Sequence, residues 1–394
     1  MNQPGNPVSF ENTEIAFGSK SNAELRKAYY LFKLIGNPNM VSFGKWATNV
    51  ALGIHFPIGW AIKGNIFKQF CGGETIDECA RATQVLDRFH IGTILDYSVE
   101  GKESEADFEV TKAETLQTIS AAHNNLHIPF CVFKVTGIAR FGLLEVVNTK
   151  GPISNEEASE WQRVRNRVDE ICAMAAETGT PIFIDAEDSW IQDAIDALAD
   201  EMMAKYNRGQ VIVYNTVQLY RHDRLQFLID SHTRAKAAGF KVGFKLVRGA
   251  YMEKERARAA EKGYIDPIQP DKESCDRDFD LAIRYCVDNA SEISICCGSH
   301  NENSNLLLSK LMDERGIDRA DKRFYFAQLF GMSDHISFNL AHAGFNVAKY
   351  VPYGPIREVI PYLIRRAQEN TSVKGQTGRE LSLILKEMQR RKLG

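Results

Sequence analysis

Cations and carboxylates that stand within or at the end of short apolar runs are the residues of this sequence best suited to chemistry. Lys134 lies in the apolar run Phe130–Thr136, and Asp185 closes the run that begins at Ile182. An ammonium group among apolar neighbours needs an anion if it is buried. Lys134 therefore faces either a carboxylate or ligand, with Asp185 as a candidate partner, or it extends outward to solvent. Both interpretations remain open from this residue alone.

Two further cations, Lys245 and Arg248, lie three residues apart at the end of another apolar run. Gly249 and Ala250 follow them, and such small residues let the backbone come close to a ligand. One cation can face an electron-accepting ring while the other meets a phosphate group. This group of residues therefore favours a large anionic cofactor.

A helical pattern near the end of the chain carries a second pair of cations. Tyr362, Arg365, Arg366 and Glu369 are spaced at i, i+3, i+4 and i+7, which places them on one helix face. A solvated face is the ordinary interpretation. If the helix lies over a binding site instead, the two arginines are placed to grip a carboxylate, with Glu369 keeping them in position.

Other polar residues near the run ends have simpler interpretations. Glu187 and Asp188 are expected to serve the start of the next helix, where negative charge is stabilised. A capping box is expected there, with Ser189 as the N-cap and Gln192 three residues further on.

Cysteine and histidine do not predict a metal site. Cys296 and Cys297 are adjacent on one expected strand and so point to opposite faces, which prevents joint chelation with His300. The eight cysteines match no zinc spacing, and buried reduced thiols are expected.

Eight apolar runs alternate with amphipathic helical segments, and this alternation forces parallel pairing of the strands. It predicts an α/β fold, a (βα)8 TIM-type barrel, whose usual length is about 250 residues. An open doubly wound sheet would call for a glycine-rich phosphate turn after the first strand, and none is present. The expected strands are Thr93–Ser98, Phe130–Gly137, Ile182–Glu187, Val211–Gln218, Gly243–Gly249, Ile293–Ser299, Phe324–Leu329 and Asn346–Pro352.

The expected organisation has three parts: an N-terminal helical arm over residues 1–90, the barrel over 91–370, and a C-terminal helical tail over 371–394. The net charge of −3 gives no field that would attract nucleic acid. No basic residue precedes Lys20, and the longest apolar stretch, Val50–Ile62, is too short to span a bilayer. A cytoplasmic protein is expected, with peripheral contact to the inner face of the cell membrane left open.

Four motifs in order resemble the proline dehydrogenase family. They are Ile184-Asp185-Ala186-Glu187, the segment from Leu246 to Tyr251, Ser299-His300-Asn301, and the segment from Tyr362 to Asn370. Each is weak alone, whereas four in family order are specific. The resemblance is to the monofunctional, eukaryote-like branch. It implies FAD at the C-terminal ends of the barrel strands, with the last helix over the barrel mouth.

The resemblance also implies roles for individual residues. Lys134, Arg365 and Arg366 would hold the carboxylate of L-proline, and Asp185, Leu246, Tyr251 and Tyr350 would surround its ring, with Asp185, Lys245, Tyr251 and Tyr350 as catalytic residues. FAD would be contacted or supported by Gln218, Lys245, Arg248, Gly249, Ala250, Tyr251, Ser299, His300, Asn301, Gln328 and Glu369. Lys245 departs from the arginine of bacterial short-chain members, so the hydrogen bond at the reactive edge of the flavin is expected to differ.

The implied reaction is the first step of proline catabolism, oxidation of L-proline to Δ1-pyrroline-5-carboxylate by hydride transfer to flavin N5. The implied partners are a membrane quinone, which takes the electrons, and a pyrroline-5-carboxylate dehydrogenase. The phenol of Tyr350 would crowd a 4-hydroxyl group, which favours proline over hydroxyproline. Three alternatives remain: a hydroxyproline dehydrogenase, a Schiff-base aldolase with Lys134 or Lys245 as nucleophile, and a non-catalytic binding protein.

Overall fold

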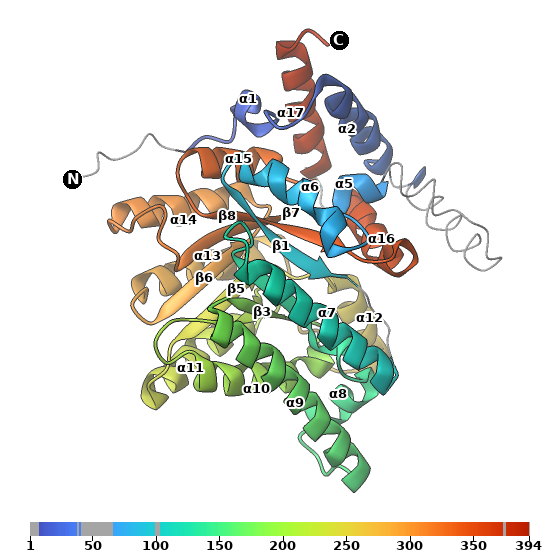
Figure 1. The fold of residues 1–394 in the computed structure, drawn as a ribbon, viewed down its shortest axis with the longest axis vertical. Helices are drawn as coiled ribbons and strands as arrows, with labels where there is room; N and C mark the ends of the chain where they lie inside the picture. The colour runs from blue at the N-terminus through green and yellow to red at the C-terminus, as the bar shows by residue number, and fades with distance from the viewer. Residues whose placement is uncertain (1–7, 38, 41–65, 99–102, 373–375, 394) are drawn as a thin grey trace, which may run out of the picture. The chain divides into compact units, whose positions relative to one another are not determined.

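The computed structural model is a closed barrel in which the strands follow one another in sequence order from β1 to β8 (Figure 1). It describes residues 8–37, 39–40, 66–98, 103–372 and 376–393, without the side chains of 367–372 and 376–377. The strands are β1 (Ile91–Tyr97), β2 (Phe130–Lys134), β3 (Ile182–Asp185), β4 (Val213–Gln218), β5 (Val242–Val247), β6 (Ile293–Gly298), β7 (Phe324–Leu329) and β8 (Val347–Tyr353). The TIM-type barrel and its eight strands are thereby confirmed.

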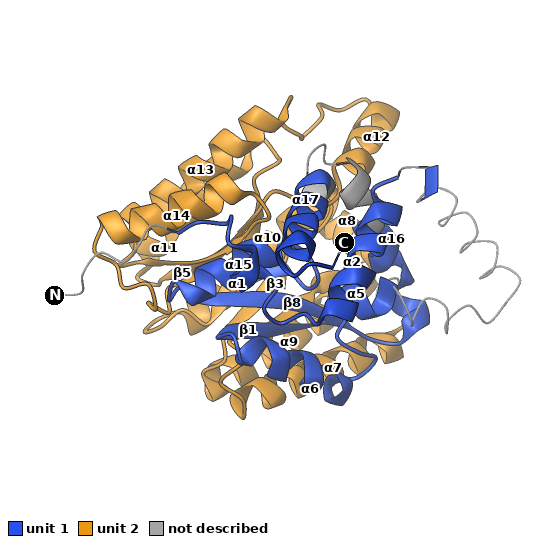
Figure 2. Ribbon diagram, turned by 90° about the horizontal axis from the view of Figure 1, so that it is seen from above, with its two compact units in different colours: residues 1–99, 328–394 blue, residues 100–327 orange. Residues whose placement is uncertain are grey.

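The chain divides into two compact units, which Figure 2 shows in different colours. One unit comprises residues 100–327 and holds β2 to β6 and most of β7, with every adjacent strand pair parallel. Its helices are α7 (Glu105–His123), α8 (Phe141–Asn148), α9 (Asn155–Thr178), α10 (Ser189–Tyr206), α11 (Arg224–Ala238), α12 (Met252–Lys262), α13 (Lys272–Asp288) and α14 (Glu302–Glu314).

Local sequence signals set the ends of these helices. At α9, the Ser154 side chain accepts from the N–H of Glu157 and the Glu157 carboxylate accepts from the N–H of Ser154, which makes a capping box. The same helix ends at Gly179, whose φ of 67° only glycine adopts without strain. Strand β2 stops at Lys134 because Val135–Gly137 forms a 3-10 turn, so this strand is shorter than expected.

The other unit comprises residues 1–99 and 328–394. Strand β1 pairs with β8 in parallel, with Ile91 opposite Val347. Its helices are α1 (Thr13–Ala16), α2 (Asn22–Ile35), α5 (Lys68–Phe70), α6 (Ile76–Asp87), α15 (Asp334–His342), α16 (Ile356–Ser372) and α17 (Gln376–Arg390). Buried residues of α2, α16 and α17 share one apolar cluster, which includes Phe32, Leu363 and Ile384. The N-terminal helices therefore pack on the C-terminal ones.

The basic residues of α17 bind the beginning of the chain. Arg391 donates to the carbonyl oxygens of Phe17 and Lys20, at 2.8 and 2.7 Å. Lys386 donates to the main-chain carbonyl of Glu11 at 2.9 Å. The segment from Lys386 to Lys392 therefore makes specific contacts with the beginning of the chain. The apolar stretch Val50–Ile62 lies outside the described residues, and the three-part division of the chain stays a prediction.

A short loop between β7 and α15 is held by both ends of the sequence. Lys349, which is fully buried, forms an ion pair with Asp334 at 2.9 Å, and Lys20 pairs with the same carboxylate at 3.1 Å. Glu380 of α17 accepts from the N–H of Ser333, which has a φ of 51°. Burial alone would raise the pKa of Asp334, but the two lysines hold it well below its usual value.

No helix among the described residues is both long and apolar enough to cross a membrane. All eight cysteines are buried and free, as expected.

Candidate functional site

Four aromatic rings close the inside of the barrel below the candidate site. Phe130 stacks on Phe183 with ring centroids 4.4 Å apart, and it meets the rings of Tyr214 and Tyr325 edge-on at 5.4 and 4.7 Å. Phe130 lies on β2 and Tyr325 on β7, two strands that are not neighbours within the unit, so this contact crosses the barrel interior. The layer therefore forms an apolar floor, and burial raises the pKa of Tyr325 to about 12.

Lys245 and Asp185 form an ion pair on the same side of the strands as this floor. Asp185 lies two residues after Phe183 on β3, and the Lys245 ammonium stands 5.3 Å from the centre of the Phe183 ring. The side chains are only 6% and 14% exposed. Lys134 is opposite Asp185 in the β2–β3 register, so it belongs to the same row. The sequence offered Lys134 as the partner of Asp185, which stays a prediction, and the structure adds an ion pair of Asp185 with Lys245 two strands away.

Arg248 ties the end of β5 to the loop after β6 and to two helices. Its guanidinium donates to Asp276 at 2.8 Å, to the Ser299 hydroxyl at 2.7 Å and to the Ser304 hydroxyl at 3.0 Å, and it lies 4.4 Å from the ring centre of Phe279. Although burial would raise the pKa of Asp276, Lys272 and Arg248 hold it below its usual value. Two predicted cofactor residues, Arg248 and Ser299, are thus brought into direct contact.

Gly249 occupies a position that no other residue could take without strain. Its φ is 135°, and an added Cβ would lie 2.5 Å from the Tyr220 ring. Tyr220 donates its N–H to the carbonyl of Arg248 at 2.7 Å, so the ring and the turn are joined. Ala250 is exposed, and Tyr251 stands directly before α12. Leu246 is fully buried, and alternation along β5 places it on the face opposite Lys245.

The loop after β6 is organised by its own side chains. The Asn301 side chain caps α14 by accepting from the N–H of Ser304 at 3.1 Å. Its N–H donates to the Ser299 hydroxyl at 3.1 Å, and Asn305 donates to the carbonyl of Ser299 at 3.0 Å. His300, between Ser299 and Asn301 in the sequence, is partly exposed.

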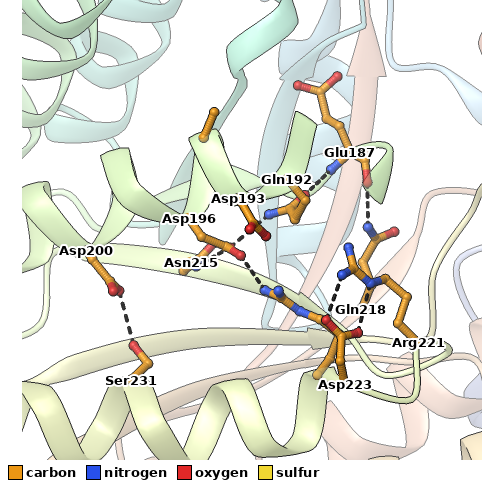
Figure 3. Close-up of polar contacts among 12 residues, drawn as sticks. Glu187, Gln192, Asp193, Asp196, Asp200, Asn215, Gln218, Arg221, Asp223 and Ser231 are labelled. Carbon is orange, nitrogen blue, oxygen red and sulfur yellow. Dashed lines mark hydrogen bonds and ion pairs between the residues drawn. The ribbon is translucent and has the colours of Figure 1, made fainter. Parts of the chain in front are cut away.

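Gln218, at the end of β4, donates its side-chain amide to the carbonyl of Glu187 at 2.7 Å (Figure 3). The Glu187 carboxylate accepts from the N–H and hydroxyl of Thr136 at 3.0 and 2.5 Å, so it secures the end of β2, a role that the sequence did not indicate. The N-cap of α10 is Asp188, not Ser189, and Gln192 accepts from the N–H of Glu187. The expected capping box is therefore wrong, because the glutamine reaches two residues further back, to Glu187.

The remaining predicted residues belong to the other unit. The Gln328 amide oxygen accepts from the Ser337 hydroxyl at 2.8 Å. Tyr350 is partly exposed on β8, and the N–H of Phe330 donates to its carbonyl at 2.8 Å. Lys349, which sequence reasoning missed, lies beside it and donates to the carbonyl of Met332 at 2.5 Å.

Arg365 and Arg366 lie on α16, as expected. Arg366 is 7% exposed, and its guanidinium lies 5.1 Å from the centre of the Tyr362 ring, one turn earlier. Tyr362 itself is buried in the apolar cluster of this unit, so it is not part of a purely polar face. The side chain of Glu369 lies outside the described residues.

Sequence reasoning also missed Asp276 and Ser304, the partners of Arg248 on α13 and α14. Helix positions of this kind carry no local signal, because an acid or serine on a helix is usually solvated. Among the described residues, no three His, Cys, Asp or Glu side chains are grouped as a metal site would require.

Comparison with known proteins gives a consistent result. The sequence model of the family described as proline dehydrogenase matches residues 79–379. A Dictyostelium discoideum protein named proline dehydrogenase 1, mitochondrial, is 31% identical over 99% of this chain and 76% of its own. A Xenopus laevis protein named hydroxyproline dehydrogenase is 30% identical over 95% of this chain and 88% of its own.

The human protein named proline dehydrogenase 1, mitochondrial, is 40% identical over 64% of this chain and 42% of its own. The solved structure of proline utilization A from Bdellovibrio bacteriovorus, inactivated by N-propargylglycine, superposes with a TM-score of 0.72 at 17% identity. That match covers 91% of this chain and 38% of the other, so each of these two matches covers less than half of the other protein. The matched region includes the barrel and the ion-paired residues at its strand ends, and the chain belongs to the proline dehydrogenase family.

Proposed function

We propose that this chain oxidises L-proline to Δ1-pyrroline-5-carboxylate with FAD as its cofactor, as the first step of proline catabolism. The observation that carries the proposal is the family match over residues 79–379, which includes every residue proposed here to bind substrate or cofactor. The position of Lys245 and Arg248 at the end of one barrel strand supports it, since barrel enzymes act at this edge.

The donor set fits a flavin dinucleotide. Arg248 and the Ser299 hydroxyl are held together at 2.7 Å, and the Gly249 turn has no room for a side chain. A guanidinium, a hydroxyl and a glycine turn are the groups that let a phosphate-bearing ligand approach the backbone. Gln218, Ala250, His300, Asn301, Gln328 and Glu369 are the other proposed contacts or supports. When bound, FAD supplies the two-electron oxidant that the protein itself lacks.

The chain's own residues bind and orient the substrate in this proposal. Lys134, Arg365 and Arg366 hold the carboxylate, since paired guanidinium groups match its two oxygens. Asp185, Tyr251 and Tyr350 surround the ring and fix its orientation, which replaces a bimolecular search by a bound pair. Leu246 does not join them, because its side chain lies on the other face of β5 from Lys245. Lys245 disfavours the protonated amine, because a nearby like charge opposes the ammonium form. These three roles are filled by residues of the barrel strands and of α16, and by Tyr251 at the start of α12.

The electron acceptor is proposed to be a membrane quinone, and the consumer of the product a pyrroline-5-carboxylate dehydrogenase. A quinone is apolar and stays in the bilayer, so this acceptor entails peripheral contact of the chain with a membrane surface. We propose a cytoplasmic location beside the inner face of the cell membrane.

Hydroxyproline oxidation is the second candidate, favoured by the relative named hydroxyproline dehydrogenase that matches 95% of this chain. Tyr350 supports proline, because a phenol beside the ring crowds a 4-hydroxyl group. A turnover of trans-4-hydroxy-L-proline comparable with that of L-proline would favour the second candidate.

The aldolase alternative needs a neutral lysine as nucleophile. Lys245 is engaged in an ion pair with Asp185, so its amine would first have to leave this partner to act as a nucleophile. Trapping of a substrate adduct by borohydride, in protein that binds no flavin, would support the aldolase.

The deciding experiment is a visible absorption spectrum before and after anaerobic addition of L-proline. A flavin spectrum that bleaches is the expected result. A flavin spectrum that persists with proline but bleaches with hydroxyproline would identify hydroxyproline as the substrate in place of proline. Protein that cannot take up added FAD would overturn the proposal.

A further inference from the structure

A chain of buried amides leads from an ion pair on the outside of the barrel to Gln218 at its strand ends. Asp196 of α10 pairs with Arg224 of α11 at 2.8 Å, and the two side chains are 7% and 3% exposed. The same carboxylate accepts from the side-chain amides of Gln192 and Asn215, each at 2.9 Å. Figure 3 shows Gln192 and Asn215 beside Asp196.

The chemistry of each partner fixes the direction of every hydrogen bond in this chain. A carboxylate paired with arginine only accepts, so Gln192 must turn its NH2 group toward Asp196. Its oxygen then faces the other way and accepts from the N–H of Glu187 at 2.8 Å, a group that only donates. The two ends agree, so the amide of Gln192 has a single orientation.

The same reasoning extends from Glu187 to Gln218. The Glu187 carbonyl only accepts, and Gln218 donates its NH2 group to it at 2.7 Å. The Gln218 oxygen is therefore the acceptor end of its amide. Gln218 lies four residues after Tyr214 on β4, and so on the side of the strand that faces the aromatic floor and Lys245.

We propose that Gln192 is a positioning residue, which holds the Glu187 turn so that Gln218 presents its oxygen to an N–H donor of the bound cofactor. In a flavin ring the matching donor is the imide N–H. Gln192 is 1% exposed and acts only through Glu187 and Gln218. The inference rests on the proposed function, because it names the group of FAD that this residue recognises.

The matched control is Gln269, which is 5% exposed and donates its amide to Asp278 at 2.6 Å on the segment after α12. Gln192→Met and Gln269→Met each remove one buried glutamine bonded to a carboxylate, but only the first releases the Glu187 turn. Gln192→Asn, whose amide is one methylene too short to span both partners, is the second variant if Gln192→Met does not fold.

The test is titration of each apoprotein with FAD and with FAD methylated at the imide nitrogen, followed by quenching of flavin fluorescence. Wild type is expected to bind FAD about tenfold more tightly than the methylated form, since methylation removes one hydrogen bond. Gln192→Met should weaken FAD binding about tenfold and lose the preference. Gln269→Met should keep both the affinity and the preference.

Three results would overturn the inference: no preference in wild type, a preference retained in both Gln192 variants, or equal losses in Gln269→Met. Wild type that takes up no flavin would instead overturn the proposed function itself. Wild type that binds FAD and oxidises proline, with an unchanged preference in the Gln192 variants, would leave the function standing and reject only the positioning role.

Discussion

Replacing Gly249 by alanine should destabilise the turn at the end of β5 through two separate effects. The φ of 135° is unfavourable for a residue with a Cβ, at about 1–2 kcal/mol. The new methyl group would also lie 2.5 Å from two atoms of the Tyr220 ring, and overpacking of this kind costs about 1–3 kcal/mol. The expected total is about 2–5 kcal/mol.

Gly239 provides the control for the first effect. It also has a positive φ, 72°, but an added Cβ there meets no atom within 4 Å. Gly239→Ala should therefore lose only about 1–2 kcal/mol. The free energy of unfolding is measured by urea denaturation, followed by far-UV circular dichroism and tryptophan fluorescence so that agreement of the two probes tests for a single transition.

Replacement of the ring isolates the second effect. In a Tyr220→Ala background, Gly249→Ala should lose only the cost of its backbone conformation, which gives a coupling energy of about 1–3 kcal/mol. A Gly249→Ala cost equal to that of Gly239→Ala, or one that is unchanged without the ring, would refute the reasoning. FAD affinity of Gly249→Ala should fall as well, because the turn is a proposed cofactor contact.

Three further outcomes are expected. Lys245→Met should lower the free energy of unfolding in urea by about 3 kcal/mol, because it leaves the nearly buried Asp185 carboxylate without this partner. The double variant Lys245→Met with Asp185→Leu should recover most of that stability but no activity. Failure of the double variant to recover stability would contradict the buried pair. Burial raises the pKa of Glu255, so the folded state favours the protonated carboxyl and the free energy of unfolding should fall as pH rises above about 4.3. Glu255→Gln should flatten this pH dependence in melting curves recorded between pH 4 and 7. An equal slope in both proteins would reject this role of Glu255. Burial raises the pKa of every cysteine thiol, so a thiol reagent at pH 8 should label the native protein very slowly. The same reagent should label all eight thiols after denaturation. Rapid labelling of the native protein would show that the thiols are accessible.

The barrel could be predicted because its signal repeats. Each strand is a short apolar run followed by an amphipathic helix, and eight repetitions leave little choice of topology. The exact ends of strands could not be predicted in the same way. At the end of β2 the apolar sequence continues into a 3-10 turn. Chain direction changes there without any change in hydrophobicity.

Pairing within the site was harder to predict than membership of it. Strand alternation and register put Lys134, Asp185 and Lys245 in one row, yet the sequence did not indicate that Lys245, two strands away, reaches the Asp185 carboxylate. That choice depends on side-chain reach across the curved interior, which sequence spacing does not contain. The partners of Arg248 on α13 and α14 were invisible for a related reason, since they come from helices far along the chain.

Glu187 illustrates a different failure. A carboxylate next to a helix start usually interacts with that helix, and this expectation was reasonable for the local sequence. Its partner is instead Thr136 at the end of the neighbouring strand β2, 51 residues earlier. Tertiary contact thus replaced the local preference.

The contacts at the β7–α15 loop bear on the order in which the molecule can be completed during synthesis. Strand β1 pairs with β8 and Lys20 with Asp334, so these early segments find their partners only after residue 327 has been made. Ser333 finds its partner later still, when Glu380 is made. At about 5–20 residues per second, the ribosome leaves that unit unfinished for on the order of tens of seconds. Residues 100–327, whose strands pair with near neighbours, emerge in the meantime and can fold first. Nascent chains stopped at residue 327, before Asp334, β8 and Glu380 are made, should therefore protect residues 100–327 from protease while leaving β1 and the helices before it open to cleavage.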